Sequence, residues 1–218
     1  MTQATIQSTR LTLRAYAPSD QGDVQSLANE PLVFRHLHAP EVPVRAADAA
    51  EHIFSLRDSA LLHPGFGTWR ISTHTGSFLG EAFLEPVPGC SFIHFGGILL
   101  PRAWGRGYAL EATAALFEYS FTHLGVDAIA AITHIENRAA ASCNRLCGMQ
   151  PFRNFSYFGT PVTAHVLTHH RWRQWRVHLV AADCATNVRK LLRLARGSAS
   201  DPRPEPHTAP LRPAPCQP

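Results

Sequence analysis

Hydrophobic and polar positions recur along this chain with two different periods. Short stretches in which apolar residues alternate with polar ones, or run together, predict β-strands at residues 9–14, 67–72, 77–84, 92–100, 127–133, 152–157 and 162–169. Stretches with apolar residues every three or four positions predict helices at residues 20–29, 45–62, 108–124, 137–147 and 173–196. Because strands and helices are interspersed, the pattern indicates an α/β protein.

One junction between a predicted strand and a predicted helix contains two glycines. The apolar run 95–100 leads into the turn 101–107, and the helical pattern begins near Tyr108. The first N–H groups of a helix lack intrahelical partners, and the helix dipole favours negative charge there. Gly105 and Gly107 suit such a turn because glycine reaches positive φ easily and lets a ligand approach the backbone. The junction therefore predicts a phosphate-binding site.

Two common phosphate-binding loops do not match this turn. A P-loop has Lys followed by Ser or Thr after its last glycine, whereas this chain has Tyr108 and Ala109 there, and its only lysine is Lys190. The dinucleotide fingerprint needs a third glycine where this chain has Leu110. A nucleotide triphosphatase is therefore not expected, and only half of the dinucleotide pattern is present.

The spacing Arg102-x-x-Gly105-x-Gly107 resembles the R/Q-x-x-G-x-G/A signature of the GNAT superfamily of N-acetyltransferases. The wider string at 104–112, Trp-Gly-Arg-Gly-Tyr-Ala-x-Glu-Ala, resembles the branch that includes the ribosomal-protein alanine acetyltransferases. In that family an asparagine opens a later helix and a glycine closes it eleven residues on, the interval between Asn137 and Gly148. The resemblance covers residues 7–172.

This resemblance implies a GNAT-type fold, in which a mixed, mostly antiparallel central sheet is flanked by helices and a splayed strand pair lies at the acetyl-CoA site. Acetyl-CoA is the implied co-substrate, and the helix pair 20–29 and 45–62 is expected to cover the acceptor. Gly96 and Gly97 are expected to ease a bulge in the strand before the turn. By position, the expected coenzyme contacts are Ile98, Leu99, Leu100, Arg102, Trp104, Gly105, Arg106, Gly107, Tyr108, Ala109 and Asn137.

Acetyl transfer to an amine calls for a base. Amines with pKa values of about 8 to 10.4 are mostly protonated at neutral pH and must lose a proton before they attack. Many relatives carry Glu at the position of His94, whose imidazole can act directly or through water. Glu81, on the neighbouring predicted strand, is the second candidate.

The leaving thiolate calls for an acid, and at the positions where the family carries that acid this sequence differs. Relatives place Tyr or Ser where this chain has Asn144 and Ala140. Ser142 is the first candidate to replace that acid, with Cys143 and Tyr157 as alternatives. The thiolate can also leave unaided, because a thiol with a pKa of about 8.5 is a tolerable leaving group.

Composition and charge indicate which partners, metals and cellular location to expect. Among residues 1–170 there are eleven arginines and thirteen acidic residues, whereas residues 171–218 carry nine basic and three acidic residues. A nucleic-acid-binding face on the main domain is therefore not expected, although the C-terminal segment can attract an acidic partner. Five cysteines without repeated spacing, no zinc motif, no long apolar segment and no signal peptide predict a metal-free, cytoplasmic protein without membrane insertion.

The sequence thus predicts three segments: an acetyltransferase domain at 7–172, a basic helical extension at 173–197 and a disordered, proline-rich tail at 198–218. The expected activity is transfer of an acetyl group from acetyl-CoA to a primary amine, on a protein N-terminus or a small molecule, in a ternary complex. The expected state is a monomer or a homodimer. Two alternatives are a non-catalytic acyl-CoA-binding or regulatory module and, less favoured, a nucleic-acid-associated protein acting through residues 189–196.

Overall fold

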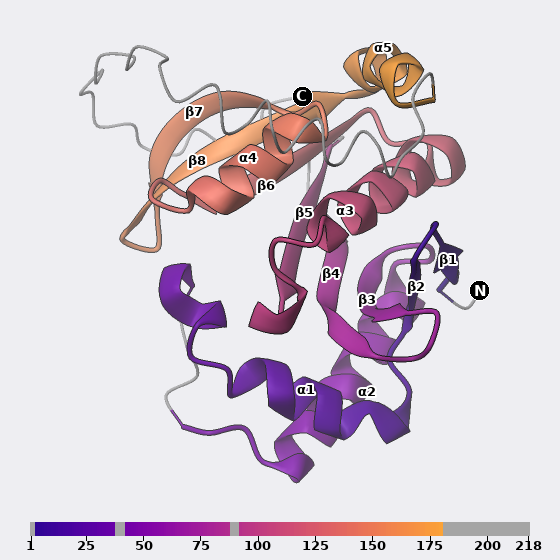
Figure 1. Cartoon of the computed structure of the whole chain (residues 1–218), viewed down its shortest axis with the longest axis vertical. Coiled ribbons are helices and arrows are strands. Elements are labelled where there is room, and N and C mark those ends of the chain that lie inside the picture. The colour runs from indigo at the N-terminus through magenta and orange to yellow at the C-terminus, as the bar shows by residue number, and fades with distance from the viewer. Residues whose placement is uncertain (1–2, 38–41, 88–91, 181–218) are drawn as a thin grey trace.

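The computed structural model describes residues 3–37, 42–87 and 92–180 (Figure 1). In these ranges eight strands form one sheet in the order β1-β2-β3-β4-β5-β6-β8-β7. The strands are β1 (Ile6–Gln7), β2 (Leu11–Ala15), β3 (Gly67–Thr73), β4 (Phe78–Pro86), β5 (Phe92–Leu99), β6 (Ala128–His134), β7 (Gln150–Tyr157) and β8 (Thr160–Thr168). The α-helices are α1 (Gln21–Ala28), α2 (Ala46–Leu62), α3 (Tyr108–Tyr119), α4 (Arg138–Leu146) and α5 (His169–Val180).

The described residues also form four short helical segments. They are η1 (Pro18–Asp20), η2 (Val33–His36), η3 (Pro101–Ala103) and the π-helical turn η4 (Ser120–Leu124). No helix among the described residues combines the length and the apolar character that a membrane span requires.

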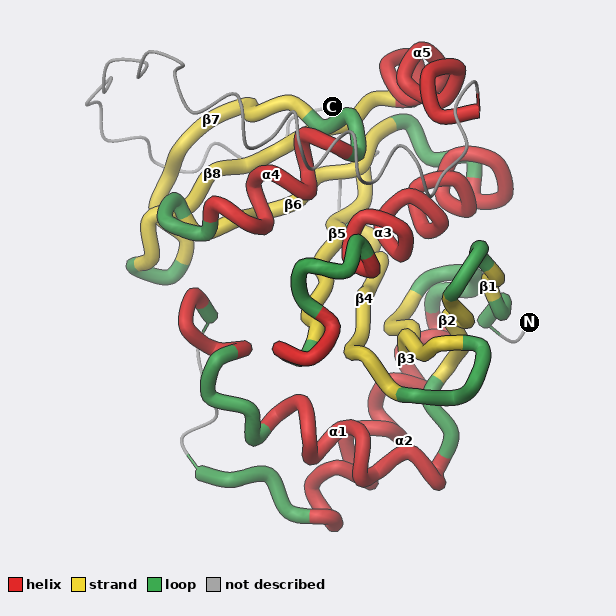
Figure 2. The backbone as a smooth tube through the Cα atoms, viewed as in Figure 1, coloured by secondary structure: helices red, strands yellow, loops and turns green. Residues whose placement is uncertain are grey.

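Two hydrophobic cores lie on opposite faces of the sheet. On one face, Leu116 and Phe117 of α3 pack with strand residues that include Trp69. On the other face, Val24 of α1 and Ile53 of α2 belong to a separate cluster. Figure 2 shows the pair α1 and α2 grouped apart from α3 and α4. The sheet is therefore flanked by helices on both faces, as the sequence predicts.

The centre of the sheet splits between β5 and β6. On one side, β5 pairs antiparallel with β4 from Ile93 to Leu99. On the other side, β5 pairs parallel with β6 only from Phe92 to His94. Beyond His94 the two strands continue without pairing, β5 to Leu99 and β6 to His134. This confirms the splayed strand pair and leaves one edge of β5 open.

The bulge expected at Gly96 and Gly97 is absent, because the register between β4 and β5 runs without a shift. Gly96 lies directly opposite Phe83, and a Cβ added to Gly96 would collide with the Phe83 ring. Glycine is needed at position 96 for this close cross-strand approach.

The predicted elements are confirmed except near the C-terminal end. Helix α3 follows Gly107 and continues through η4 to Gly125, where a φ of 64° ends it as predicted. Helix α5, however, begins at His169, so the helix start predicted at 173 is wrong. Its Trp172 is buried and stacks on Phe121 with ring centroids 5.0 Å apart, which draws the first turn into the core. The predicted helix beyond Val180 and the tail 198–218 lie outside the described residues.

Candidate active site

The turn between β5 and α3 presents a row of backbone N–H groups. Gly105 and Gly107 have φ values of 71° and 76°, a left-handed conformation that directs successive N–H groups outward. Within the described part of the chain, the N–H groups of residues 105–110 donate no hydrogen bond, and the first helical bond runs from the Glu111 N–H to the Gly107 carbonyl. A Cβ on Gly105 would meet no atom within 4 Å, so the space beside it is open. Such a row at the start of a 12-residue helix can bind an anion.

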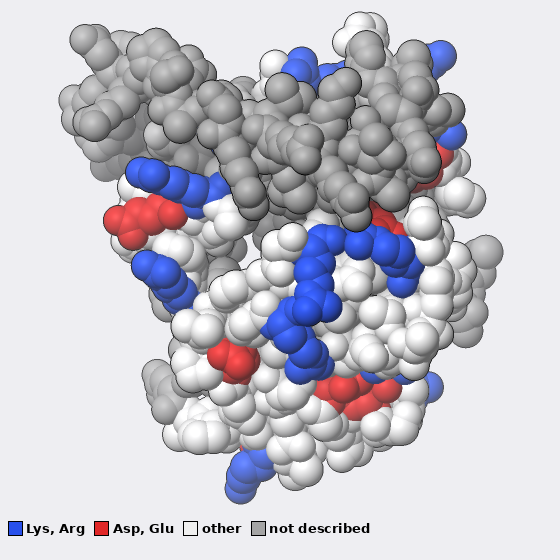
Figure 3. Space-filling view, viewed as in Figure 1, with Lys and Arg blue, Asp and Glu red and all other residues white. Residues whose placement is uncertain are grey.

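A half-buried ion pair between Arg10 and Glu111 lies next to this turn. The Glu111 carboxylate is almost fully buried and accepts hydrogen bonds from the Ser8 hydroxyl and the Arg10 backbone. The Arg10 guanidinium bonds the same carboxylate at 2.6 Å and donates to the Arg106 carbonyl at 3.0 Å. Figure 3 shows basic side chains gathered in a band on this face. Because Arg10 offsets the charge of Glu111, an anion at the helix start is not repelled by that carboxylate.

Two of the expected coenzyme contacts use their side chains to hold the turn. Arg102 donates from Nη2 to the Phe78 carbonyl at 2.7 Å, which ties the turn to the start of β4. Trp104 donates its indole N–H to the Leu99 carbonyl at 2.7 Å, which ties it to the end of β5. Because the Arg102 guanidinium is engaged in this way, the backbone of the turn is the part that can face a ligand.

The direction of the backbone groups along β5 follows from one hydrogen bond. Leu100 donates its N–H to the Leu79 carbonyl at 2.9 Å, so Leu100 bonds toward β4. Successive residues of an antiparallel strand turn their backbone groups to opposite sides. Ile98 therefore also bonds toward β4, and among the three expected pantetheine contacts only Leu99 turns its backbone to the open edge.

The same alternation places two further residues at the open edge, Phe95 and Gly97. Sequence reasoning missed both of them. The apolar pattern of β5 shows that a strand is present, but it does not show which backbone groups pair with β4. That alternation depends on the register between the two strands, which has no signal within β5 itself.

Glu81 lies on β4 directly opposite Ile98, so both side chains project to the face covered by α1 and α2. The buried Tyr16 donates its hydroxyl to Glu81 Oε2 at 2.8 Å. Burial raises the pKa of Glu81 above its ordinary value, and the hydrogen bond from Tyr16 opposes that shift. A carboxylate with a raised pKa near the open edge of β5 has the chemistry of a general base.

His94 lies on the same face but at the closed end of the split, where β5 still pairs with β6. Its side chain is 28% exposed, and its Nδ1 is 4.0 Å from the carboxylate of Glu85. Its ring also packs edge-on against Phe83. Burial lowers the pKa of His94, and the charge of Glu85 opposes this shift. His94 therefore favours the neutral imidazole, which is the form that accepts a proton.

Helix α4 supplies the residues beside the other wall of the split. Asn137 caps this helix by accepting the Ala140 N–H at its Oδ1, at 3.1 Å. Asn144 is buried and donates to the Thr133 hydroxyl at 3.0 Å, which fixes α4 to β6. Ser142 accepts a hydrogen bond from Arg145 at 3.2 Å. The position where relatives carry a tyrosine thus holds a structural amide.

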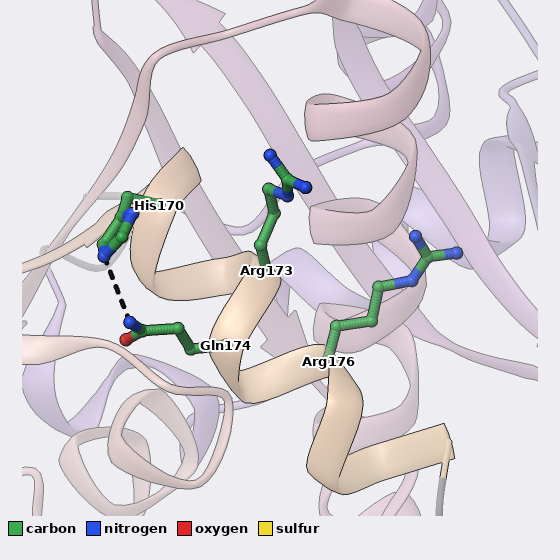
Figure 4. Close-up of a pocket in the computed structure, with 4 residues that line it drawn as sticks. All are labelled: His170, Arg173, Gln174 and Arg176. Carbon is green, nitrogen blue, oxygen red and sulfur yellow. Dashed lines mark hydrogen bonds between the residues drawn. The ribbon is translucent and has the colours of Figure 1, made fainter.

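A surface hollow of about 510 Å³ lies elsewhere, on helix α5. Its lining residues are His170, Arg173, Gln174 and Arg176, and His170 and Gln174 are joined by a 3.1 Å hydrogen bond (Figure 4). It contains none of the residues of the turn, β5 or β4, and contributes nothing to the site described above.

Comparisons with known proteins agree with this geometry. The family model described as an acetyltransferase (GNAT) domain matches residues 10–150. An Aspergillus fumigatus protein, FsC-acetyl coenzyme A-N(2)-transacetylase, is 32% identical over 115 residues, which cover 49% of this chain and 48% of that protein. The chain spans about half the length of the curated relatives it matches.

Two solved structures show the same fold at low sequence identity. RimL, a ribosomal L7/L12 alpha-N-protein acetyltransferase in complex with coenzyme A, has a TM-score of 0.66 at 18% identity, covering 76% of this chain and 98% of RimL. Spermidine N-acetyltransferase from Vibrio cholerae, in complex with coenzyme A and spermine, has a TM-score of 0.64 at 19% identity, covering 76% of this chain and 99% of that one. Since the family model covers most of the described residues, the chain belongs to the GNAT acetyltransferase family.

Proposed function

We propose that this protein transfers an acetyl group from acetyl-CoA to a primary amine by direct attack in a ternary complex. The observation that carries the proposal is the row of N–H groups at residues 105–110, which donate to no atom of the described residues and lie beside the open edge of β5. The row suits a pyrophosphate, and the open edge suits the amide groups of a pantetheine arm. Membership of the GNAT family supports acetyl-CoA as the co-substrate.

The coenzyme contacts follow from the backbone directions. The backbone N–H groups of residues 105–109 hold the pyrophosphate. Leu99 and Gly97 bond the pantetheine arm and the thioester from the open edge, where a backbone N–H stabilises the negative charge that develops on the carbonyl oxygen. Asn137 keeps its side-chain NH2 available for the coenzyme while its Oδ1 caps α4.

Glu81 acts as the base in this proposal. It is level with Ile98 across the β4–β5 pair, and its raised pKa suits removal of a proton from an ammonium group. His94 lies four residues farther along β5, roughly 13 Å of strand, and would act through water. Its neutral imidazole makes it the second candidate.

The leaving thiolate departs without a dedicated tyrosine acid. Asn144, at that position, is engaged with Thr133 and has no acidic proton. A thiolate whose conjugate acid has a pKa of about 8.5 can leave and be protonated afterwards by solvent. Ser142 stays the first candidate for a side-chain donor, because its hydroxyl accepts a hydrogen bond from Arg145 and keeps its own proton available.

The acceptor is proposed as a class rather than a compound. The structural neighbours include enzymes named for a protein N-terminus and for spermidine, so both protein N-termini and small amines belong in a screen. The monomeric or dimeric state and a cytoplasmic location remain predictions from the sequence. A non-catalytic acyl-CoA-binding module is the second candidate, favoured by the amide at Asn144.

The test is release of free thiol from acetyl-CoA by the purified full-length protein, with a panel of peptides and small amines. We expect thiol release that depends on an amine and is lowered by roughly 100-fold or more in Glu81→Gln at neutral pH, while acetyl-CoA still binds. Binding of acetyl-CoA without amine-dependent release across the panel would favour the non-catalytic module. Absence of coenzyme binding would contradict both candidates.

A further inference from the structure

A second cluster of side chains lies at the free end of β6. His134 is the last residue of β6, Glu136 lies in the turn before α4, and His36 is the last residue of η2. One nitrogen or oxygen atom from each of the three lies within 4.8 Å of the others. The two imidazole rings have centroids 5.1 Å apart. Both histidines are half-buried and Glu136 is exposed, so the cluster opens to solvent.

We propose that His36, His134 and Glu136 bind a divalent transition-metal ion of the zinc class. Two imidazoles and one carboxylate are a donor set that Zn²⁺, Co²⁺ and Ni²⁺ accept readily. Mg²⁺ and Ca²⁺ prefer sites made of oxygen atoms and suit this cluster poorly. Three protein ligands leave a fourth position for water or for a donor atom of a ligand.

Sequence analysis predicted no metal because the spacing shows no zinc motif. The three ligands come from two distant parts of the chain, and only the fold brings His36 next to the other two. Such a site has no local signature, since His134 and Glu136 alone form a pair that is too small to suggest a metal centre.

One contact within the cluster limits the affinity. His134 Nδ1 accepts the Glu136 backbone N–H at 3.1 Å. A neutral imidazole has one nitrogen with a lone pair and one with a proton, so His134 must give up this hydrogen bond when it coordinates an ion. We therefore expect micromolar rather than nanomolar dissociation constants.

The bound ion would link η2 to the end of β6, where the His36 and His134 rings already meet. His36 belongs to the connection between α1 and α2, whereas His134 and Glu136 belong to the β6 wall of the split (Figure 1). If the proposed acetyl transfer is correct, this connection lies beside the path of the amine. An ion that fixes η2 to β6 would then narrow that path and inhibit transfer without displacing the coenzyme.

The test is calorimetric titration of Zn²⁺ and of Co²⁺ into the tag-free full-length protein, with its cysteines kept reduced. We expect one site, lost or weakened at least roughly tenfold in His36→Ala and in Glu136→Gln. His63→Ala, an exposed histidine at the end of α2, is the matched control and should bind as the wild type does. Mg²⁺ should produce no binding heat.

The result is independent of the proposed catalytic function. Acetyl-CoA binding by each variant reports an intact fold and tests the coenzyme site separately. If the wild type, both cluster variants and the control bind Zn²⁺ and Co²⁺ alike, the binding is adventitious and the proposal is wrong. Absence of binding to the wild type overturns it equally, even if acetyl transfer is observed.

Discussion

Burial and a hydrogen bond from Tyr16 together set the pKa of Glu81. Its position opposite Ile98 places it beside the split, and burial among the residues of α1 and α2 raises its pKa. Tyr16 holds one carboxylate oxygen at 2.8 Å and moderates that rise. The sequence suggested Glu81 only from its place on a strand. The contact of Tyr16 with Glu81 could not be predicted, because nothing in the sequence shows that the end of β2 lies next to the middle of β4.

The Tyr16 hydrogen bond gives a directional test of Glu81 as the base. Tyr16→Phe removes a contact that lowers the pKa of Glu81, so that pKa should rise further. Because the base acts only when ionised, the acid limb of kcat/KM against pH should move to higher pH. Glu81→Gln should lower kcat/KM by roughly 100-fold or more at pH values above the acid limb, where Glu81 is ionised in the wild type. An unmoved acid limb in Tyr16→Phe would exclude Glu81 as the group that controls it.

The β5–α3 unit is the element whose parts the sequence predicted best. Strand, glycine turn and helix each carry their own local signal, namely an apolar run, residues that tolerate positive φ, and helical periodicity. Which backbone groups of β5 face its open edge could not be predicted from the sequence, because pairing with β4 decides it. The start of α5 was missed because packing of Trp172 on Phe121 outweighs the local pattern. Both features depend on contacts between segments that are distant in the chain.

The ion pair next to the turn should support this element measurably. Glu111→Gln keeps the shape of the side chain but weakens its bonds to Arg10 and Ser8, so we expect a loss of about 1–3 kcal/mol in the free energy of unfolding. Arg45→Met breaks a solvent-exposed pair with Asp48 and should change that free energy much less, because water screens exposed charges. Urea denaturation of both variants compares them. Equal effects would show that the Arg10–Glu111 pair is not a special support for the turn.

At the scale of the whole molecule, stability should depend on a buried histidine. His165 on β8 is 2% exposed, and among the described residues its Nδ1 has no hydrogen-bond partner. Burial lowers its pKa below the unfolded value of about 6.5. As pH falls below 6.5, the unfolded state binds a proton that the folded state resists, so stability declines.

Denaturation with urea at pH 7 and pH 5 checks this dependence. The contribution of His165 to this change is a loss of stability between the two values, of at most about 1.4 kcal/mol per pH unit. His94, whose pKa is also lowered by burial, contributes in the same direction. His165→Leu should show a smaller loss than the wild type over the same interval. A variant with an undiminished slope would show that His165 is not its source.

The most direct test of the coenzyme site is calorimetric titration of acetyl-CoA into the wild type, Ala109→Glu and Ala47→Glu. Ala109 and Ala47 are both exposed and both second residues of their helices, α3 and α2, so each substitution places a carboxylate in a favourable position for the fold. Only Ala109→Glu puts that charge against the row of N–H groups. We predict binding by the wild type and Ala47→Glu, and a large loss of affinity in Ala109→Glu. Equal binding by all three proteins would contradict the assignment of the pyrophosphate to this turn.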